Sequence, residues 1–139
     1  MADDVLLNKA ASIERAVRRV REEHAGDDRN LLENQTRQDA IMLNLQRAAE
    51  TSIDAAMHLV RVRRLGIPQE TRDAFDLLER AGIIDAVVSD RMKKMVGFRN
   101  VAIHEYQKLN LDIVRRIVGE HLEHFLAFSR LLLQLAAPS

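Results

Sequence analysis

Four side chains near residue 100 have the types and the spacing needed for proton transfer and for stabilisation of an anion. Arg99 is followed directly by Asn100, and His104 and Tyr106 come within the next two helical turns. On a helix Asn100 and His104 lie four residues apart and meet on one side, where the amide can orient the imidazole. His104 can then move a proton while Arg99 stabilises negative charge on a phosphoryl oxygen, without a metal. The same residue types also occur on amphipathic helices as a snorkelling cation, a boundary imidazole and an interface phenol.

The helix that carries these residues is expected to run from about Asp85 to Tyr106. Asp85 follows an apolar pair and can cap the N-terminus, and no Gly or Pro intervenes before Gly97. At about 100° per residue, one face of this helix is apolar. That face contains Val88, Met92, Met95, Val96, Ala102 and Ile103.

Arg99 falls within the apolar face, at about 140° from His104 on the helical wheel. A guanidinium cannot lose its proton, so in such surroundings it needs a carboxylate, a phosphate-bearing ligand or a polar seam between subunits. Because of this separation, Arg99 and His104 of one chain do not converge easily on a single phosphate. Two motif helices that face each other across a two-fold axis could present both residues to one groove. Candidate counter-charges are the acidic residues Glu50, Asp54, Asp112, Glu120 and Glu123.

The stretch from Met95 to Tyr106 resembles the signature of the HepT-type toxins of the HEPN superfamily. That signature is Arg, a polar residue, three further residues, His, any residue and Tyr, and no position here departs from it. The likeness extends back through Leu65–Pro68 and Ala74–Glu79 and through the order of the helices.

The resemblance implies the toxin of a type II/VII-like toxin–antitoxin pair, acting as a metal-independent endoribonuclease. It assigns Arg99 and His104 as the catalytic pair, Asn100 as the polar residue beside them, and Tyr106 as a residue that can become O-AMP-tyrosine. The AMP would come from a minimal nucleotidyltransferase, the antitoxin, and it would silence the toxin. The family also forms homodimers whose motif helices line a shared cleft. A non-catalytic helical binding subunit of a nucleotidyltransferase complex is the alternative.

Composition bounds the fold and the partners. The 139 residues are 47% hydrophobic and 30% charged, which predicts one helical domain over residues 1–139 with a hydrophobic core. The 21 basic and 21 acidic residues cancel, so any attraction for RNA has to be local. Arg91, Lys93 and Lys94, just before the motif, form the favoured RNA-binding patch. Two other basic runs are given structural roles. Arg61–Arg64 complements a helix dipole, and the arginines of the first helix favour solubility.

Other sites receive less support. His121 and His124 are three apart, but no Asp or Cys completes a metal set, so they are interpreted as core or boundary histidines. We expect no metal and no cofactor. The absence of cysteine, of a long apolar run and of a basic leader before Asp3 indicates a cytoplasmic protein without a membrane segment.

Helical periodicity covers the chain without a competing strand signal, which predicts an all-α, up-and-down bundle of four long helices plus one short helix, as in HEPN proteins. The first helix is capped by Asp3 or Asp4 and ends near Ala25-Gly26, and the last is capped by Asn110. Four more helices are expected: Asn30 to Arg64, Thr71 to Ala81, Asp85 to Tyr106, and Leu111 to about Ala136. The first of these four could break near Asn34-Gln35-Thr36.

Overall fold

The computed structural model describes residues 2–104 and 110–138, and in these ranges every regular element is a helix. The elements are α1 (Asp4–His24), α2 (Arg29–Leu32), α3 (Gln35–Val62), α4 (Thr71–Arg80), α5 (Ala86–His104), α6 (Leu111–Arg116), the π-helical segment η2 (Ile117–His121) and α7 (Leu122–Ala136). The predicted all-α bundle is therefore confirmed. None of the helices in the described part combines the length and the apolar character needed to span a bilayer.

Side-chain caps explain where several helices begin. Asp3 caps α1, and the expected break in the second helix occurs at Asn34, whose side chain accepts a hydrogen bond from the Arg37 amide and so starts α3. Asn110 caps α6 in the same way. The last helix differs from expectation only in its π-helical turn, which contains Gly119 and divides it into α6, η2 and α7.

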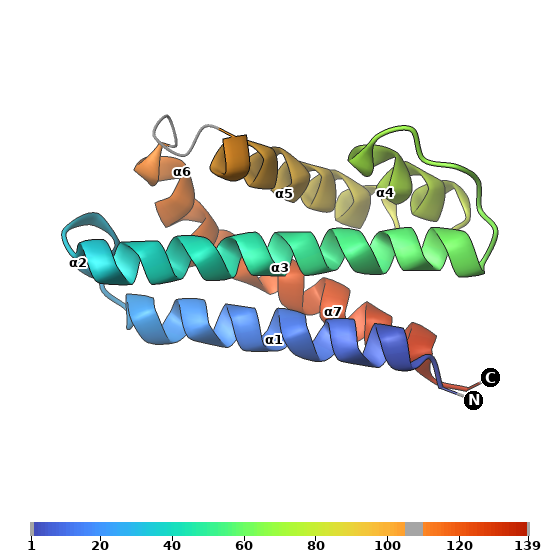
Figure 1. The fold of residues 1–139 in the computed structure, drawn as a ribbon, viewed down its shortest axis with the longest axis horizontal. Coiled ribbons are helices and arrows are strands. Elements are labelled where there is room, and N and C mark those ends of the chain that lie inside the picture. The colour runs from blue at the N-terminus through green and yellow to red at the C-terminus, as the bar shows by residue number, and fades with distance from the viewer. Residues whose placement is uncertain (1, 105–109, 139) are drawn as a thin grey trace.

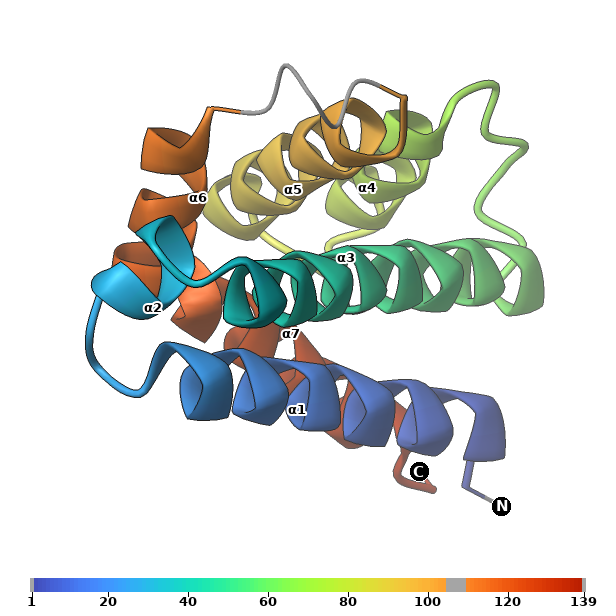
Figure 2. The same ribbon diagram turned by 60° about the vertical axis from the view of Figure 1, so that its left-hand side comes forward.

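The helices form two groups around α3 (Figures 1 and 2). On one side α1 runs beside α3, and α7 packs against both. On the other side α4 and α5 lie next to each other, and both contact α3. The motif helix α5 therefore rests on α3, with α4 along one flank and α7 along the other.

A contiguous apolar cluster joins these layers. Phe75 of α4 and Phe128 of α7 are both buried and meet edge to face with their ring centroids 5.9 Å apart. From the predicted apolar face of α5, the side chains of Met92, Met95, Val96 and Ala102 are buried. These contacts hold α5 in one rotational setting, which decides where each polar side chain of the motif points.

The prediction for Ile103 was wrong, because 49% of this residue is exposed although it lies on the predicted apolar face. The reason is the length of the neighbouring helix. Helix α4 begins at Thr71, which contacts Arg99, so Ile103 lies one turn beyond the part of α5 that α4 covers. Phe98, outside the predicted face, is buried on another side of α5.

Asp3 ties the two ends of the described chain to α3. Its carboxylate accepts hydrogen bonds from the Leu6 amide at 3.2 Å and from Nε2 of the buried His58 at 2.8 Å, while its own amide donates to the Ala136 carbonyl. Burial opposes ionisation, but the hydrogen bonds from His58 and Leu6 outweigh it and lower the pKa of Asp3 below its ordinary value of 3.8.

Replacing Asp3 by alanine is expected to lower the free energy of unfolding by about 1–2 kcal/mol at pH 7, because a helix cap and a partly buried hydrogen bond to His58 are lost together. Since the folded state lowers the carboxyl pKa, this stabilisation is complete above the unfolded pKa and disappears as the pH falls through the folded value. Urea titrations of Asp3→Ala and of the control Asp4→Ala, at pH 7 and at acidic pH, measure the effect. Equal losses in both variants at pH 7 would contradict the assignment.

Candidate active site

Arg99 occupies a nearly closed site between three helices. Only 16% of its side chain is exposed, as the sequence predicted for a residue on the apolar face. Its Nη1 lies 3.3 Å from Oε2 of Glu50 on α3, and its Nη2 donates to Oγ1 of Thr71, the first residue of α4, at 3.4 Å. Glu50, one of the five candidate counter-charges, is thus the observed one.

The contacts of Arg99 leave part of its hydrogen-bonding capacity unused. The Glu50 side chain is 46% exposed and meets the guanidinium through one oxygen, and Nε of Arg99 is buried without a hydrogen-bond partner among the described residues. A guanidinium binds a phosphate or carboxylate best through two parallel N–H groups. The site therefore presents a permanent cation that one solvent-accessible carboxylate neutralises only partly.

His104 and Asn100 lie on another side of α5 from Arg99. Both residues are exposed, and in the described ranges neither side chain hydrogen bonds to the other or to a further residue. Free imidazole and amide groups at a surface are available to a ligand, although the expected hydrogen bond between them is not formed. Tyr106 lies outside the described residues.

The three basic residues before the motif divide between two flanks of α5. Lys93 points to α4, where its Nζ lies 2.6 Å from Oδ1 of Asp76, and this hydrogen bond raises the pKa of Lys93 above its ordinary value. Lys94, which pairs with Asp90 at 3.2 Å, and Arg91 both line the groove on the opposite flank of α5. Successive residues turn by about 100° around a helix, so neighbours in sequence reach different surfaces.

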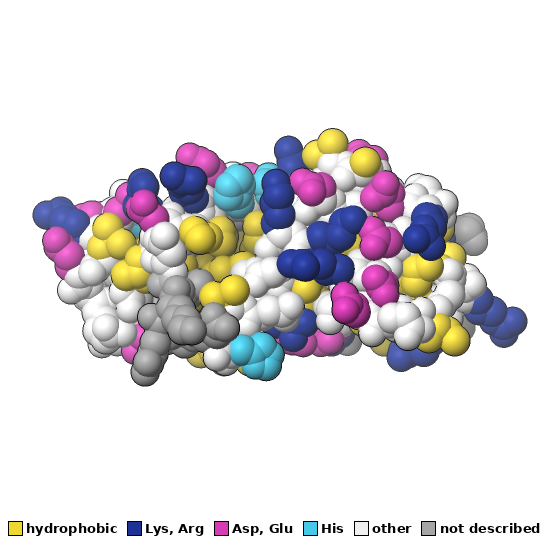
Figure 3. All heavy atoms as spheres, turned by 90° about the horizontal axis from the view of Figure 1, so that it is seen from above, with side chains coloured by type: hydrophobic (Ala, Val, Ile, Leu, Met, Phe, Trp, Pro, Cys, Tyr) yellow, Lys and Arg dark blue, Asp and Glu magenta, His cyan; other side chains and the backbone are white. Residues whose placement is uncertain are grey.

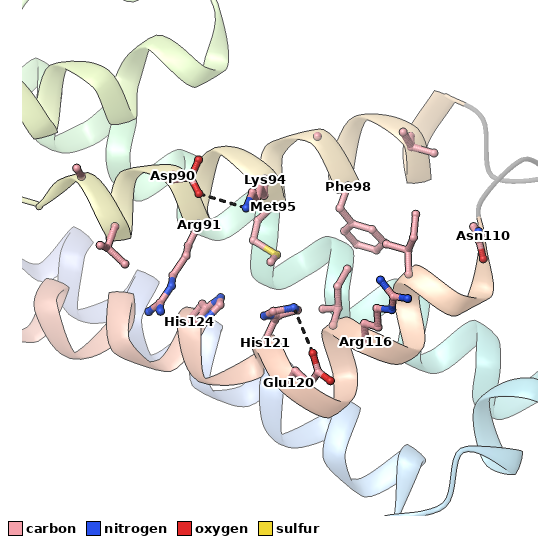
Figure 4. Close-up of a pocket in the computed structure, with 16 residues that line it drawn as sticks. Asp90, Arg91, Lys94, Met95, Phe98, Asn110, Arg116, Glu120, His121 and His124 are labelled. Atoms are coloured by element: carbon pink, nitrogen blue, oxygen red, sulfur yellow. Dashed lines mark ion pairs between the residues drawn. The ribbon is translucent and has the colours of Figure 1, made fainter.

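A groove of about 880 Å³ separates α5 from the α6–η2–α7 helix (Figure 4). Met95, Phe98 and Ile117 supply apolar lining, and the π-helical segment contributes one of its walls. Basic side chains from both helices, Arg91, Lys94 and Arg116, lie along it. Figure 3 shows that apolar side chains remain exposed on this face of the molecule.

Two histidines lie in this groove with their ring centroids 4.9 Å apart. His124 has a buried Nδ1 without a hydrogen-bond partner among the described residues, and burial, followed by the charges of Arg91, His121 and Lys94, lowers its pKa below the ordinary value. His121 is partly exposed and lies 3.9 Å from Glu120. Both are boundary histidines, as predicted. In the described ranges no three His, Asp or Glu side chains are grouped so that they could hold a metal ion.

Comparison with known proteins identifies the family of this chain. The family model described as "Ribonuclease HepT-like" matches residues 13–132. The chain belongs to the HepT-like ribonuclease family. The mRNA nuclease HepT of Shewanella oneidensis is 47% identical over 126 residues, which are 91% of this chain and 94% of the relative.

Several solved structures have the same fold as this chain. A toxin–antitoxin structure with AMP-PNP superimposes with a TM-score of 0.88 at 45% identity, over 94% of this chain and 98% of the other. A tri-AMPylated Shewanella oneidensis HEPN toxin in complex with an MNT antitoxin also has a TM-score of 0.88 at 45% identity, over 94% and 97%. YutE from Bacillus subtilis, at 16% identity and a TM-score of 0.71 over 93% and 94%, shares the fold alone.

Within this HepT-like fold the sequence did not indicate two features around the motif. One is Thr71, whose hydroxyl meets Arg99 from a separate helix. The other is the groove, although a signal for it was present: Met95, Phe98 and Val101 recur every third residue and give α5 a second apolar side.

Proposed function

We propose that this chain is the toxin of a type II/VII-like toxin–antitoxin pair and acts as a metal-independent endoribonuclease on mRNA. The observation that carries the proposal is Arg99, a nearly buried and only partly neutralised cation, five residues before an exposed His104 in a HepT-like chain. The name of the Shewanella oneidensis relative, an mRNA nuclease, supports the choice of substrate.

The proposed mechanism assigns one role to each motif residue. Arg99 binds the scissile phosphate and stabilises the negative charge that develops on its oxygens, exchanging its loose pairing with Glu50 for a two-pronged contact with phosphate. His104 transfers a proton as general acid or base. Asn100, on the same side of α5 as His104, orients the imidazole or the RNA. No step in this scheme calls for a metal or a cofactor.

We further propose that two copies form a homodimer with a shared cleft. Within one chain, Arg99 faces α3 and α4 whereas His104 faces solvent, so a partner helix is needed to bring both groups to one phosphate. Exposed apolar residues that line the groove supply a surface for such a partner: Val87, Val101 and Ile113. Exposed apolar groups that lie together are typical of interaction surfaces.

Silencing follows from modification of Tyr106 by a minimal nucleotidyltransferase antitoxin. The tri-AMPylated relative, bound to an MNT antitoxin, supports this part of the proposal. An AMP group on Tyr106, two residues after His104, would place a bulky anion where the RNA phosphate has to bind.

Arg91, Lys93 and Lys94 are proposed as RNA contacts. Lys93 also pairs with Asp76, so its charge is partly neutralised. An mRNA substrate also supports a cytoplasmic location. The proposed domain spans residues 1–139.

Expression of the chain alone is expected to arrest the growth of a bacterial host, because free toxin degrades mRNA. Arg99→Ala and His104→Ala are each expected to relieve the arrest while the purified proteins keep a helical circular-dichroism spectrum. Colony counts after induction measure the effect. Equal growth of the wild type and both variants would favour the alternative, a non-catalytic binding subunit of a nucleotidyltransferase complex.

A further inference from the structure

Arg72, in the first turn of α4, reaches across to the motif helix. Its Nε donates a hydrogen bond to the carbonyl of Lys93 on α5 at 3.4 Å. The preceding residue, Thr71, holds Arg99 on the other side of the same helix. The start of α4 thus contacts α5 on two sides, and a terminal nitrogen of Arg72 lies against α5 at Gly97.

Gly97 provides the space for this guanidinium. A Cβ atom built on Gly97 would lie 2.8 Å from a terminal nitrogen of Arg72, closer than ordinary contact allows. A glycine inside a helix is otherwise unfavourable, since alanine is the better helix former. At Gly97 the absence of a side chain lets the tip of Arg72 come this close to α5.

Arg72 differs from its basic neighbours because it has no carboxylate partner among the described residues. Lys93, Lys94 and Arg99 each pair with a carboxylate. Arg72 is exposed, and within the described part of the chain no carboxylate lies within ion-pair distance of it. Figure 3 shows the basic and acidic side chains interleaved over α4 and the adjoining part of α5. An unpaired guanidinium in such surroundings is available to an external anion.

The position of Arg72 relates it directly to the motif. Lys93, Gly97, Asn100 and His104 follow one another at intervals of four, three and four residues and therefore form one stripe along α5. The guanidinium of Arg72 lies on this stripe at Gly97, and the helical rise puts it about 10 Å along the axis from His104. A separation of this size allows one extended strand to contact both groups.

We propose that Arg72 binds a backbone phosphate of the RNA, on the same strand as the phosphate that is cleaved, and so aligns the strand along the stripe toward His104. This inference rests on the proposed ribonuclease function and adds a substrate-binding residue outside the motif. A guanidinium anchored by one N–H to a main-chain carbonyl keeps its other N–H groups for a phosphate. Arg72 acts on binding and alignment of the strand, and takes no part in proton transfer.

The test compares Arg72→Ala, Arg72→Lys and Gly97→Ala with the control Arg80→Ala, which removes the same charge from the last turn of the same helix. Steady-state cleavage gives KM and kcat for each variant. In a second assay the same changes are made in a His104→Ala background, and fluorescence anisotropy measures the binding of a labelled single-stranded RNA oligonucleotide at several salt concentrations. Thermal melting reports on folding.

For Arg72→Ala we expect KM to rise roughly five- to tenfold with kcat changed less than about twofold, and the salt slope of RNA binding to fall by about 0.7–1. Arg72→Lys should recover the salt slope and part of the affinity, because it keeps the charge without the fork. Gly97→Ala should weaken RNA binding less than Arg72→Ala, because the tip of the flexible arginine can shift away from the added methyl group. It should melt no lower than the wild type, because alanine favours the helix.

An unchanged KM, RNA affinity and salt slope in Arg72→Ala would overturn the inference, even if binding to an antitoxin became weaker. If the wild type cleaves no RNA, the proposed function fails, whereas the anisotropy assay in the His104→Ala background still decides whether Arg72 contacts RNA.

Discussion

Arg99→Ala is expected to slow RNA cleavage by about 10²- to 10³-fold, and His104→Ala by about 10²- to 10⁴-fold. The first change removes the cation that stabilises the phosphoryl oxygens, and the second removes the group that moves the proton. Both proteins should remain folded. His104 is exposed, and the Glu50 carboxylate that Arg99→Ala leaves behind is 46% exposed and can be hydrated. Single-turnover cleavage of a labelled RNA in the presence of a chelator measures the rates.

Arg80→Ala is the matched control for loss of a charge and should cleave at the wild-type rate. Arg99→Lys separates charge from geometry, because an ammonium keeps the charge but cannot bind two phosphate oxygens through a planar fork. We expect it to be closer to Arg99→Ala than to the wild type. Rates within a few-fold of the wild type for both alanine variants would contradict the catalytic roles.

A mixture of the two inactive chains tests the shared cleft. If Arg99 of one copy acts with His104 of the other, a mixed dimer holds one intact site of two. Unfolding and refolding the two variants together at equal amounts should then restore about a quarter of the wild-type rate, because about half of the dimers are mixed. If both residues act within one chain, the mixture remains inactive and the proposed cleft is wrong.

Tyr106→Phe is expected to abolish the transfer of AMP to this chain by its cognate nucleotidyltransferase. The chain contains a single tyrosine, so the loss of one hydroxyl removes every phenolic acceptor while the aromatic ring is kept. Intact-protein mass spectrometry after incubation with the transferase and ATP measures the increment, and the wild type should gain one or more AMP units. In cells that contain the transferase, Tyr106→Phe should remain toxic where the wild type is silenced.

Two comparisons make the result for Tyr106 decisive. His104→Ala keeps the tyrosine and should still gain AMP, which separates modification from catalysis. Tyr106→Phe should itself cleave RNA at a rate near that of the wild type, since the scheme gives the phenol no chemical step. A mass increment that survives in Tyr106→Phe would mean that another residue is the acceptor.

Much of the helical framework could be predicted from local sequence. Asp3, Asn34 and Asn110 start helices because their side chains accept hydrogen bonds from amides two or three residues ahead, an interaction contained in a few neighbouring residues. The apolar period of α5 likewise placed Arg99 on a buried face. Ile103 was misplaced because the end of the protecting helix α4 is not a local property of α5.

The groove and the π-helical turn could not be derived in the same way. Phe98 was recognisable as apolar, but its burial depends on how close the α6–η2–α7 helix comes to α5. The widened turn at Ile117–His121 changes the direction of the side chains that follow it. His121 and His124 reach the groove only as a result of that packing.

The sequence by itself determined the helices, the order of the motif residues and the need of Arg99 for a partner, because backbone hydrogen bonds and helical periodicity act over about four residues. Only the tertiary structure decided that the partner is Glu50, that Lys93 turns to Asp76, and that Arg72 lies over Gly97. These contacts join separate helices, and the packing of the whole core sets the rotation and the offset of each helix against its neighbours.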